Sequence, residues 1–249
     1  MNLQKYPRLR TVDKIKPPFP LNKFPKSFGY RVGEEVAYLL ATKGSPVLEG
    51  REWEEIFANC IGAQWKPSNV GLDDVISRGC AWGAKTVKSN APAKQDKVRL
   101  ISGRNSLIYS FNTTEIGSVH PDSLGEKILS IWNERVYMIW KKYKHVRTVV
   151  LIKSNDLSEV MVFEFETIRY DPECFTWKWN KNNNLEGFSK VETKHCFTWQ
   201  PHGSQFTIIE KVPRDSLIVK IKLPKRLNKK SILRSIGFDK SWIAISKNR

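Results

Sequence analysis

The sequence predicts an α/β fold of the α+β type, with a central mixed β-sheet flanked by helices and a mostly β C-terminal half. Apolar residues recur at helical spacing in three segments before residue 144. Between residues 50 and 153 the expected order is helix, two or three strands, helix, strand, which is typical of a small mixed sheet with helices on its faces. After residue 154, short runs rich in aromatic and β-branched residues predict further strands, mainly antiparallel.

Three helices are predicted from their apolar stripes. Residues 33–43 and 50–61 carry apolar side chains at helical spacing. The clearest helix is residues 123–143, where Ser123 and Glu126 form a capping-box pattern at the N-terminus.

Strands are predicted at short apolar or alternating runs. Residues 146–153 form a nearly continuous apolar run, as expected for a buried strand. The other predicted strands are 73–77, 80–88, 98–102, 107–111, 160–165, 175–179, 196–200, 206–209 and 217–223.

Composition divides the chain into an arm and a domain. Residues 1–28 contain five prolines among basic residues, which predicts an extended basic arm that packs on the domain rather than a helix. Residues 29–249 are expected to form a single domain. Its core is expected at about 50–153, followed by a β-rich, DNA-contacting region at about 154–249.

The charge balance indicates a polyanionic partner. Lys and Arg number 42 against 25 Asp and Glu, for a net charge of +17. Nucleic acid fits this excess better than a membrane surface does, because no basic amphipathic helix stands out. No apolar stretch approaches the ~20 residues that a membrane span requires, and the N-terminus lacks the apolar region of a signal peptide.

The four cysteines lie far apart and include no C-x-x-C pair. Neither a zinc site nor a disulfide scaffold is therefore expected. We predict reduced thiols in a cytoplasmic protein. The residues are Cys60, Cys80, Cys174 and Cys196.

The most informative segment is residues 71–88, GLDDVISRGCAWGAKTVK. Asp73 and Asp74 open a short apolar run, and a second apolar run about ten residues on carries Lys85. A carboxylate at the start of one strand and a lysine on its hairpin partner can converge at one point. In so basic a chain this convergence favours Mg²⁺-dependent cleavage of nucleic acid, because the carboxylate can hold the metal while the lysine orients a water beside the phosphate.

Residues 50–153 resemble the PD-(D/E)XK nuclease superfamily and, within it, the type II restriction endonucleases. In that family a helix bearing a glutamate precedes a strand with an aspartate, and the next strand carries an acid-x-Lys motif. Glu54, Asp74 and Lys85 stand at the matching positions. The resemblance implies a restriction-endonuclease-like core, Mg²⁺ as cofactor, all three residues as catalytic, and Asp74 and Glu54 as metal ligands.

One position departs from the family pattern. Gly83 stands two residues before Lys85, where the family has an acidic residue. The second carboxylate must therefore come from another element. Glu54 is the best candidate because it lies beside the apolar stripe of its helix, whereas Glu55 lies nearer the solvent face.

Two polar segments that adjoin predicted strands are candidates for contact with DNA bases. Residues 102–106 offer a guanidinium suited to guanine and an amide suited to adenine, and residues 199–205 offer two glutamines and a histidine. The predicted DNA-binding residues are Arg104, Asn105, Ser106, Gln200, His202 and Gln205.

These residues together predict a type II restriction endonuclease that hydrolyses phosphodiester bonds at a specific sequence of double-stranded DNA. The resemblance implies a homodimer on a palindromic site, with each subunit cutting one strand. Three alternatives stay open. They are a DNA repair or junction nuclease of the same superfamily, a non-catalytic nucleic-acid-binding protein, which Gly83 favours, and an RNA-binding module that stacks bases on Trp177, Trp179 and Trp199.

Overall fold

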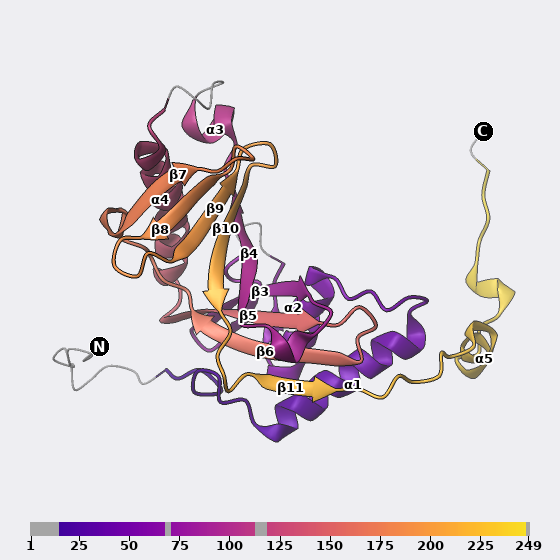
Figure 1. Cartoon of the computed structure of the whole chain (residues 1–249). Helices are drawn as coiled ribbons and strands as arrows, with labels where there is room; N and C mark the ends of the chain where they lie inside the picture. Colours follow the sequence, from indigo (N-terminus) through magenta and orange to yellow (C-terminus); the bar gives the residue numbers. More distant parts are fainter. Residues whose placement is uncertain (1–14, 68–70, 113–118, 248–249) are drawn as a thin grey trace.

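The computed structural model describes residues 15–67, 71–112 and 119–247, and its body contains two β-sheets (Figure 1). The first sheet has six strands in the order β1-β2-β3-β5-β6-β11 and is mixed, because β3 and β5 are parallel while the other neighbours are antiparallel. The second has five antiparallel strands in the order β4-β10-β9-β8-β7. The predicted α+β class, the central mixed sheet and the mostly β C-terminal half are confirmed.

The α-helices are α1 (Lys26–Thr42), α2 (Gly50–Ile61), α3 (Leu107–Phe111), α4 (Pro121–Trp140) and α5 (Lys229–Ser235), and the 3₁₀ turns are η1 (Pro92–Lys94), η3 (Pro172–Cys174) and η4 (Lys240–Trp242). The strands of the six-stranded sheet are β1 (Gln64–Trp65), β2 (Val75–Ser77), β3 (Cys80–Lys88), β5 (His145–Lys153), β6 (Glu159–Glu166) and β11 (Leu217–Lys220). Those of the five-stranded sheet are β4 (Lys97–Arg104), β7 (Phe175–Trp179), β8 (Leu185–Ser189), β9 (His195–Gln200) and β10 (Gln205–Lys211).

Buried side chains on both faces of the six-stranded sheet hold the body together. Helices α1 and α2 cover one face, where the rings of Phe57 on α2 and Trp82 on β3 meet edge to face with centroids 5.9 Å apart. On the other face, Val98 and Leu100 of β4 pack against Val150 on β5 and its neighbours. The five-stranded sheet and α4 therefore stand on the face opposite α1 and α2 (Figure 1).

The described part of the N-terminal arm packs on the domain, as predicted. Ile15, Phe19 and Phe24 lie against the core between α1, α2 and the six-stranded sheet. The arm is shorter than predicted, because α1 begins at Lys26 and not after residue 28. Pro25 stands at the N-cap, where its missing N–H costs the helix no hydrogen bond. Residues 1–14 of the predicted arm lie outside the described residues.

A buried ion pair fixes this arm to the sheet. The guanidinium of Arg147 on β5 lies 2.6 Å from the carboxylate of Glu164 on β6 and donates to the backbone oxygen of Phe19 at 3.0 Å. Both charged side chains are almost fully buried. We expect Arg147→Met to lower the free energy of unfolding by about 3–5 kcal/mol, because it leaves the Glu164 carboxylate buried without its cation. Denaturant unfolding measures this loss, and adding Glu164→Gln should recover most of it, because glutamine removes the charge and still accepts the indole N–H of Trp82.

Several sequence predictions about elements are wrong. Residues 107–111 form the helix α3 and not a strand, because five apolar-rich residues are too few to reveal a period. The helix α4 begins at Pro121, so the predicted capping box at Ser123 and Glu126 does not form. The predicted strand 98–102 does form, as β4, but it pairs with β10 in the five-stranded sheet rather than in the predicted core. The strand β8 was not predicted at all.

Beyond β11 the chain leaves the body as an extended segment that ends in α5 and η4 (Figure 1). We call residues 223–247 the C-terminal arm. None of the described helices is long and apolar enough to cross a lipid bilayer. All four cysteines are free thiols, in agreement with the prediction.

Candidate active site

Helix α2 carries Glu54 to the edge of the hairpin formed by β2 and β3. A capping box between Glu49 and Glu52 starts the helix, and its apolar stripe is buried against the sheet. Glu54 is half-buried beside that stripe, and the indole N–H of Trp65 on β1 donates to its Oε2 at 3.1 Å. Glu55 is exposed and lines a separate pocket between α1 and α2. The two glutamates therefore lie on the sides of the helix that the sequence predicts.

Asp74 directly precedes β2 and is only 3 % exposed. The backbone N–H of Ala84 on β3 donates to Asp74 Oδ2 at 3.2 Å, which anchors the carboxylate to the hairpin. Burial raises the pKa of Asp74 from its ordinary value of 3.8 to about 6. The positive charge of Lys85 opposes this rise in pKa, and the negative charges of Glu54 and Asp73 add to it.

Lys85 is half-buried on β3, with its Nζ 3.5 Å from the backbone oxygen of Gly71. Burial lowers the pKa of the Lys85 ammonium, the carboxylates of Asp74 and Glu54 raise it, and the guanidinium of Arg135 lowers it. Each of these charges is thus close enough to Lys85 to shift its protonation. The three predicted residues, Glu54, Asp74 and Lys85, therefore lie near enough to one another for their charges to interact.

The absence of an acidic residue at position 83 has a steric cause. A Cβ at Gly83 would lie 2.6 Å from the backbone oxygen of Gly71 and 3.2 Å from Cα of Leu72. The segment that leads into Asp74 therefore occupies the space that an acidic side chain would need. The departure from the family pattern is built into the backbone of this hairpin.

We expect Gly83→Glu, which restores the acid-x-Lys pattern, to damage the protein rather than improve it. The overlap with Gly71 should lower the free energy of unfolding by about 1–3 kcal/mol or more, as overpacked sites do. Thermal unfolding measures this effect, with Gly50→Ala as the control because a Cβ there meets nothing within 4 Å. A Gly83→Glu protein as stable as the wild type would contradict the steric explanation.

A pocket of about 480 Å³ opens beside Lys85. Among the described residues, its lining includes the cations Lys85, Arg104 and Arg135 and no carboxylate. Arg135 comes from α4, and its Nη1 donates to the backbone oxygen of Ser102 at 2.7 Å. A concave surface with three cations and no acid attracts anions such as phosphate groups. Sequence reasoning missed Arg135; its one signal was a position beside the apolar stripe of the predicted helix.

The two predicted DNA-reading segments lie side by side. In the five-stranded sheet Gln205 pairs with Arg104 on one side and with Gln200 on the other. Asn105 is 2 % exposed, and its backbone N–H donates to the oxygen of Ser204 at 2.7 Å, which ties the end of β4 to the β9–β10 turn. Arg104 and Asn105 also line the cationic pocket.

The remaining predicted readers differ in exposure. His202 is exposed on the β9–β10 turn, whereas the hydroxyl of Ser106 caps α3 by accepting from the backbone N–H of Tyr109 at 3.5 Å. Tyr109 itself is 94 % exposed. An aromatic ring this exposed, five residues from Arg104, is suited to stacking on a base. Residues 107–111 were predicted as a strand, so the exposed position of Tyr109 was not expected.

The carboxylates suit a hard divalent cation that keeps much of its water. No group of three or more His, Cys, Asp and Glu side chains able to hold a metal occurs in the described ranges. Mg²⁺ is commonly bound through one or two carboxylates, several waters and substrate phosphates. Asp74 and Glu54 could supply two such carboxylates. Burial is the main cause of the raised pKa of Asp74, and a cation would offset the smaller contribution from the charge of Glu54.

Comparison of the chain with protein-family models, with curated proteins and with solved structures finds no match.

Proposed function

We propose that this protein is a Mg²⁺-dependent, site-specific endonuclease that hydrolyses phosphodiester bonds in double-stranded DNA, in the manner of the type II restriction endonucleases it resembles. The observation that carries the proposal is the position of Lys85, which lines the cationic pocket and whose charge is coupled to the carboxylates of Asp74 and Glu54. Two carboxylates beside an anion-binding surface are the arrangement that metal-assisted phosphodiester hydrolysis requires.

Each residue has a role that its surroundings support. Asp74 and Glu54 would hold the metal, which supplies Lewis-acid stabilisation of the negative charge that builds on the phosphate. Lys85 would contact the scissile phosphate and orient the attacking water, and its contact with the Gly71 carbonyl limits where its Nζ can lie. Arg135 and Arg104 would hold neighbouring phosphates in the pocket.

A non-catalytic DNA-binding protein is the second candidate. Gly83 in place of the acidic residue and the lack of a three-ligand cluster among the described residues favour it. An RNA-binding module that stacks bases on tryptophans has less support, because Trp177 is 5 % and Trp199 is 0 % exposed. Both rings belong to the core between the five-stranded sheet and α4.

Incubation with a linear plasmid and Mg²⁺, with EDTA as the control, tests the proposal. Discrete fragments that appear only with Mg²⁺ would support a site-specific endonuclease. Nicking that depends on branched or damaged DNA would instead support a repair or junction nuclease of the same superfamily. Tight DNA binding without any cleavage, by a preparation with native unfolding behaviour, would favour the non-catalytic candidate.

We further propose that the enzyme acts as a homodimer held by the C-terminal arm. Between residues 223 and 247 the arm carries seven Lys or Arg against one Asp, and none of its residues is buried. Its exposed apolar side chains include Trp242, at 60 %, and Ile243, at 58 %. A pocket of about 430 Å³ between α1 and α2 has charge and apolar surface complementary to those of the arm. Its described lining includes three glutamates and one cation, together with apolar and aromatic side chains. These residues are Glu35, Glu52, Glu55, Lys43, Tyr38, Leu39 and Ile56.

We expect Trp242→Ser with Ile243→Ser to convert the dimer to a monomer, because these side chains would lose the apolar surface of the second copy. Sedimentation velocity measures the change. Val191→Ser, which alters an 87 % exposed side chain on a turn of the five-stranded sheet, is the control and should leave the dimer intact. A wild-type protein that sediments as a monomer on its DNA would contradict the arm-mediated dimer.

A further inference from the structure

A second basic pocket, of about 370 Å³, lies at the start of β4, at the opposite end of this strand from the candidate active site. It is lined by side chains from β3, β4, β9 and β10 and from the segment before β4. Of the lining residues that the structure describes, four are cations, one is a histidine and none is a carboxylate. The lining residues that bear on the argument are Lys88, Lys97, Arg99, Lys194 and His195.

The charges in this pocket are not neutralised by ion pairs within the part of the chain that the structure describes. The ion pairs there involve other lysines and arginines. Burial lowers the pKa of His195, and the nearby charges of Arg99 and Lys97 lower it further, although Glu186 opposes them. Positive charge thus outweighs negative charge in the lining of this pocket, and such a surface attracts phosphate groups.

The two cationic pockets lie toward opposite ends of β4, and we treat the surface that joins them along this strand as one groove. The strand β4 alternates, with Lys97, Arg99 and Ile101 exposed and the residues between them buried. The pocket beside the active site contains Lys85 of β3 with the last residues of β4, and the second pocket contains Val87 and Lys88 of β3 with the first residues of β4. β3 and β4 thus each contribute to both pockets. The earlier residue of β3 lies with the last residues of β4, and the later residues of β3 lie with the first residues of β4.

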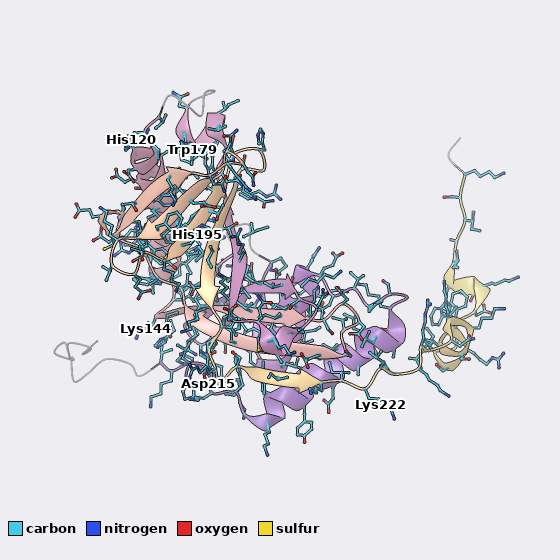
Figure 2. The ribbon with its side chains drawn as sticks, in the orientation of Figure 1. His120, Lys144, Trp179, His195, Asp215 and Lys222 are labelled. Carbon is cyan, nitrogen blue, oxygen red and sulfur yellow. The ribbon has the colours of Figure 1, made fainter. Side chains whose placement is uncertain are left out.

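The free edge of β4 leaves this groove open. β4 is an edge strand that pairs with β10 on one side, and no described strand pairs with its other side. β4 lies where the five-stranded sheet stands on the six-stranded sheet (Figure 1). His195, labelled in Figure 2, belongs to the five-stranded sheet, whereas Lys222 lies on the segment that leads away from β11.

We propose that this groove, which we call the β4 groove, binds the sugar-phosphate backbone of DNA at a distance from the bond that is cut. The inference rests on the proposed function, because it takes the pocket beside Lys85 as the cleavage end. From Lys97 to Arg104 the strand extends roughly 23 Å at ~3.3 Å per residue, which corresponds to six or seven nucleotides at ~3.4 Å of axial rise each. Lys97, Arg99 and Lys194 would fix the direction in which the DNA leaves the active site.

Binding measured in EDTA tests the proposal without requiring cleavage. The protein is titrated with duplexes of increasing length, from about 8 to 24 base pairs. The test variant is Lys97→Ala with Arg99→Ala, and the control is Lys220→Ala with Lys222→Ala, which removes the same charge at the far edge of the other sheet. All four side chains are exposed, so both variants should fold, and thermal unfolding checks this.

We expect the test variant to bind the longest duplexes about tenfold or more weakly and the shortest almost normally. The test variant should make about two fewer phosphate contacts. The slope of log K against log salt should therefore become shallower by roughly 1.8. The control should change affinity little at every length. Equal losses in the two variants, or a loss in the test variant that does not depend on length, would overturn the β4 groove.

The failure of this inference differs from the failure of the proposed function. If the protein cuts DNA with Mg²⁺ and both variants lose the same DNA affinity, the β4 groove proposal is wrong and the nuclease proposal stands. If the protein never cuts DNA but the test variant loses DNA affinity in a length-dependent way, the β4 groove proposal stands and the nuclease proposal is wrong. Lys97→Glu with Arg99→Glu provides a second check and should weaken binding to long duplexes further than the alanine pair does.

Discussion

Asp74→Asn should abolish DNA cleavage and, at pH 8, raise the free energy of unfolding by about 2–3 kcal/mol. The pKa of Asp74 is about 6 in the folded protein against an ordinary value of 3.8, so the ionised carboxylate is less stable there than in the unfolded chain. Asparagine removes that charge and can still accept the N–H of Ala84. Loss of a metal ligand together with a gain in stability is the behaviour expected of a residue kept for chemistry rather than for folding.

The pH dependence of this gain follows from the sign of the shift. The pKa of Asp74 is higher in the folded protein than in the unfolded chain. The protonated carboxyl of Asp74 therefore makes its full contribution to stability below about pH 4, and this contribution is lost as the pH rises through about 6 and the group ionises. The advantage of Asp74→Asn should therefore be largest at pH 8 and absent at pH 4. In the wild type, cleavage should fall as the pH drops below about 6, since protons then compete with Mg²⁺ for the carboxylate.

Denaturant unfolding at pH 4 and pH 8 measures the first effect, and Asp156→Asn is its control. Asp156 lies in the turn between β5 and β6, where hydrogen bonds from Ser158 and Ser154 lower its pKa to about 2. Its replacement should give no gain in stability at pH 8 and should leave cleavage unchanged. An Asp74→Asn protein less stable than the wild type at pH 8, or one that still cuts DNA, would contradict the assignment.

Lys85→Met should slow the cleavage step by about 10²–10³-fold while DNA binding changes little. The ammonium would act on the charge that develops on the scissile phosphate, and Arg104 and Arg135 would remain to hold the DNA. Burial also lowers the pKa of Lys85, so the charged form is disfavoured in the folded protein and an apolar side chain of similar length should not destabilise it. Lys85→Arg should fail to restore the rate, because a planar guanidinium cannot place a compact charge where the Lys85 ammonium lies, 3.5 Å from the backbone oxygen of Gly71.

Single-turnover cleavage at saturating enzyme separates the rate of the Lys85 variants from their affinity. Lys220→Met, on the exposed face of β11, removes one charge from the same sheet and serves as the control. A Lys85→Met enzyme that cuts at nearly the wild-type rate, or one whose loss is entirely in binding, would remove Lys85 from the chemistry.

Local sequence patterns predicted the helix α2 and the β2–β3 hairpin, because their apolar periods and turn residues are short-range signals. The side of α2 that carries Glu54 followed from its apolar stripe in the same way. The partner of β4 could not be predicted, since its alternating pattern fits either sheet and the choice depends on contacts with β10 some hundred residues away. The same limit explains why β8 and the register that brings Gln205 beside Arg104 were missed.

Part of the candidate site could likewise be predicted from the sequence, and part could not. Asp74 and Lys85 lie in one hairpin, so their proximity could be read from a single segment. The steric reason for Gly83 could not, because it depends on the path of the backbone at Gly71 and Leu72. The position of Arg135 could not be predicted either, since α4 reaches the pocket beside Lys85 only through its packing against the five-stranded sheet.

The central claim is that the β2–β3 hairpin and the helix α2 contribute to one metal-dependent centre. A double-mutant cycle of Asp74→Asn and Glu54→Gln, measured by single-turnover cleavage with Mg²⁺, tests it most directly. If both carboxylates hold the same ion, either change alone should remove most of the activity, and the double variant should be no slower than the slower single variant. Losses that multiply, or a Glu54→Gln enzyme as fast as the wild type, would contradict a shared centre.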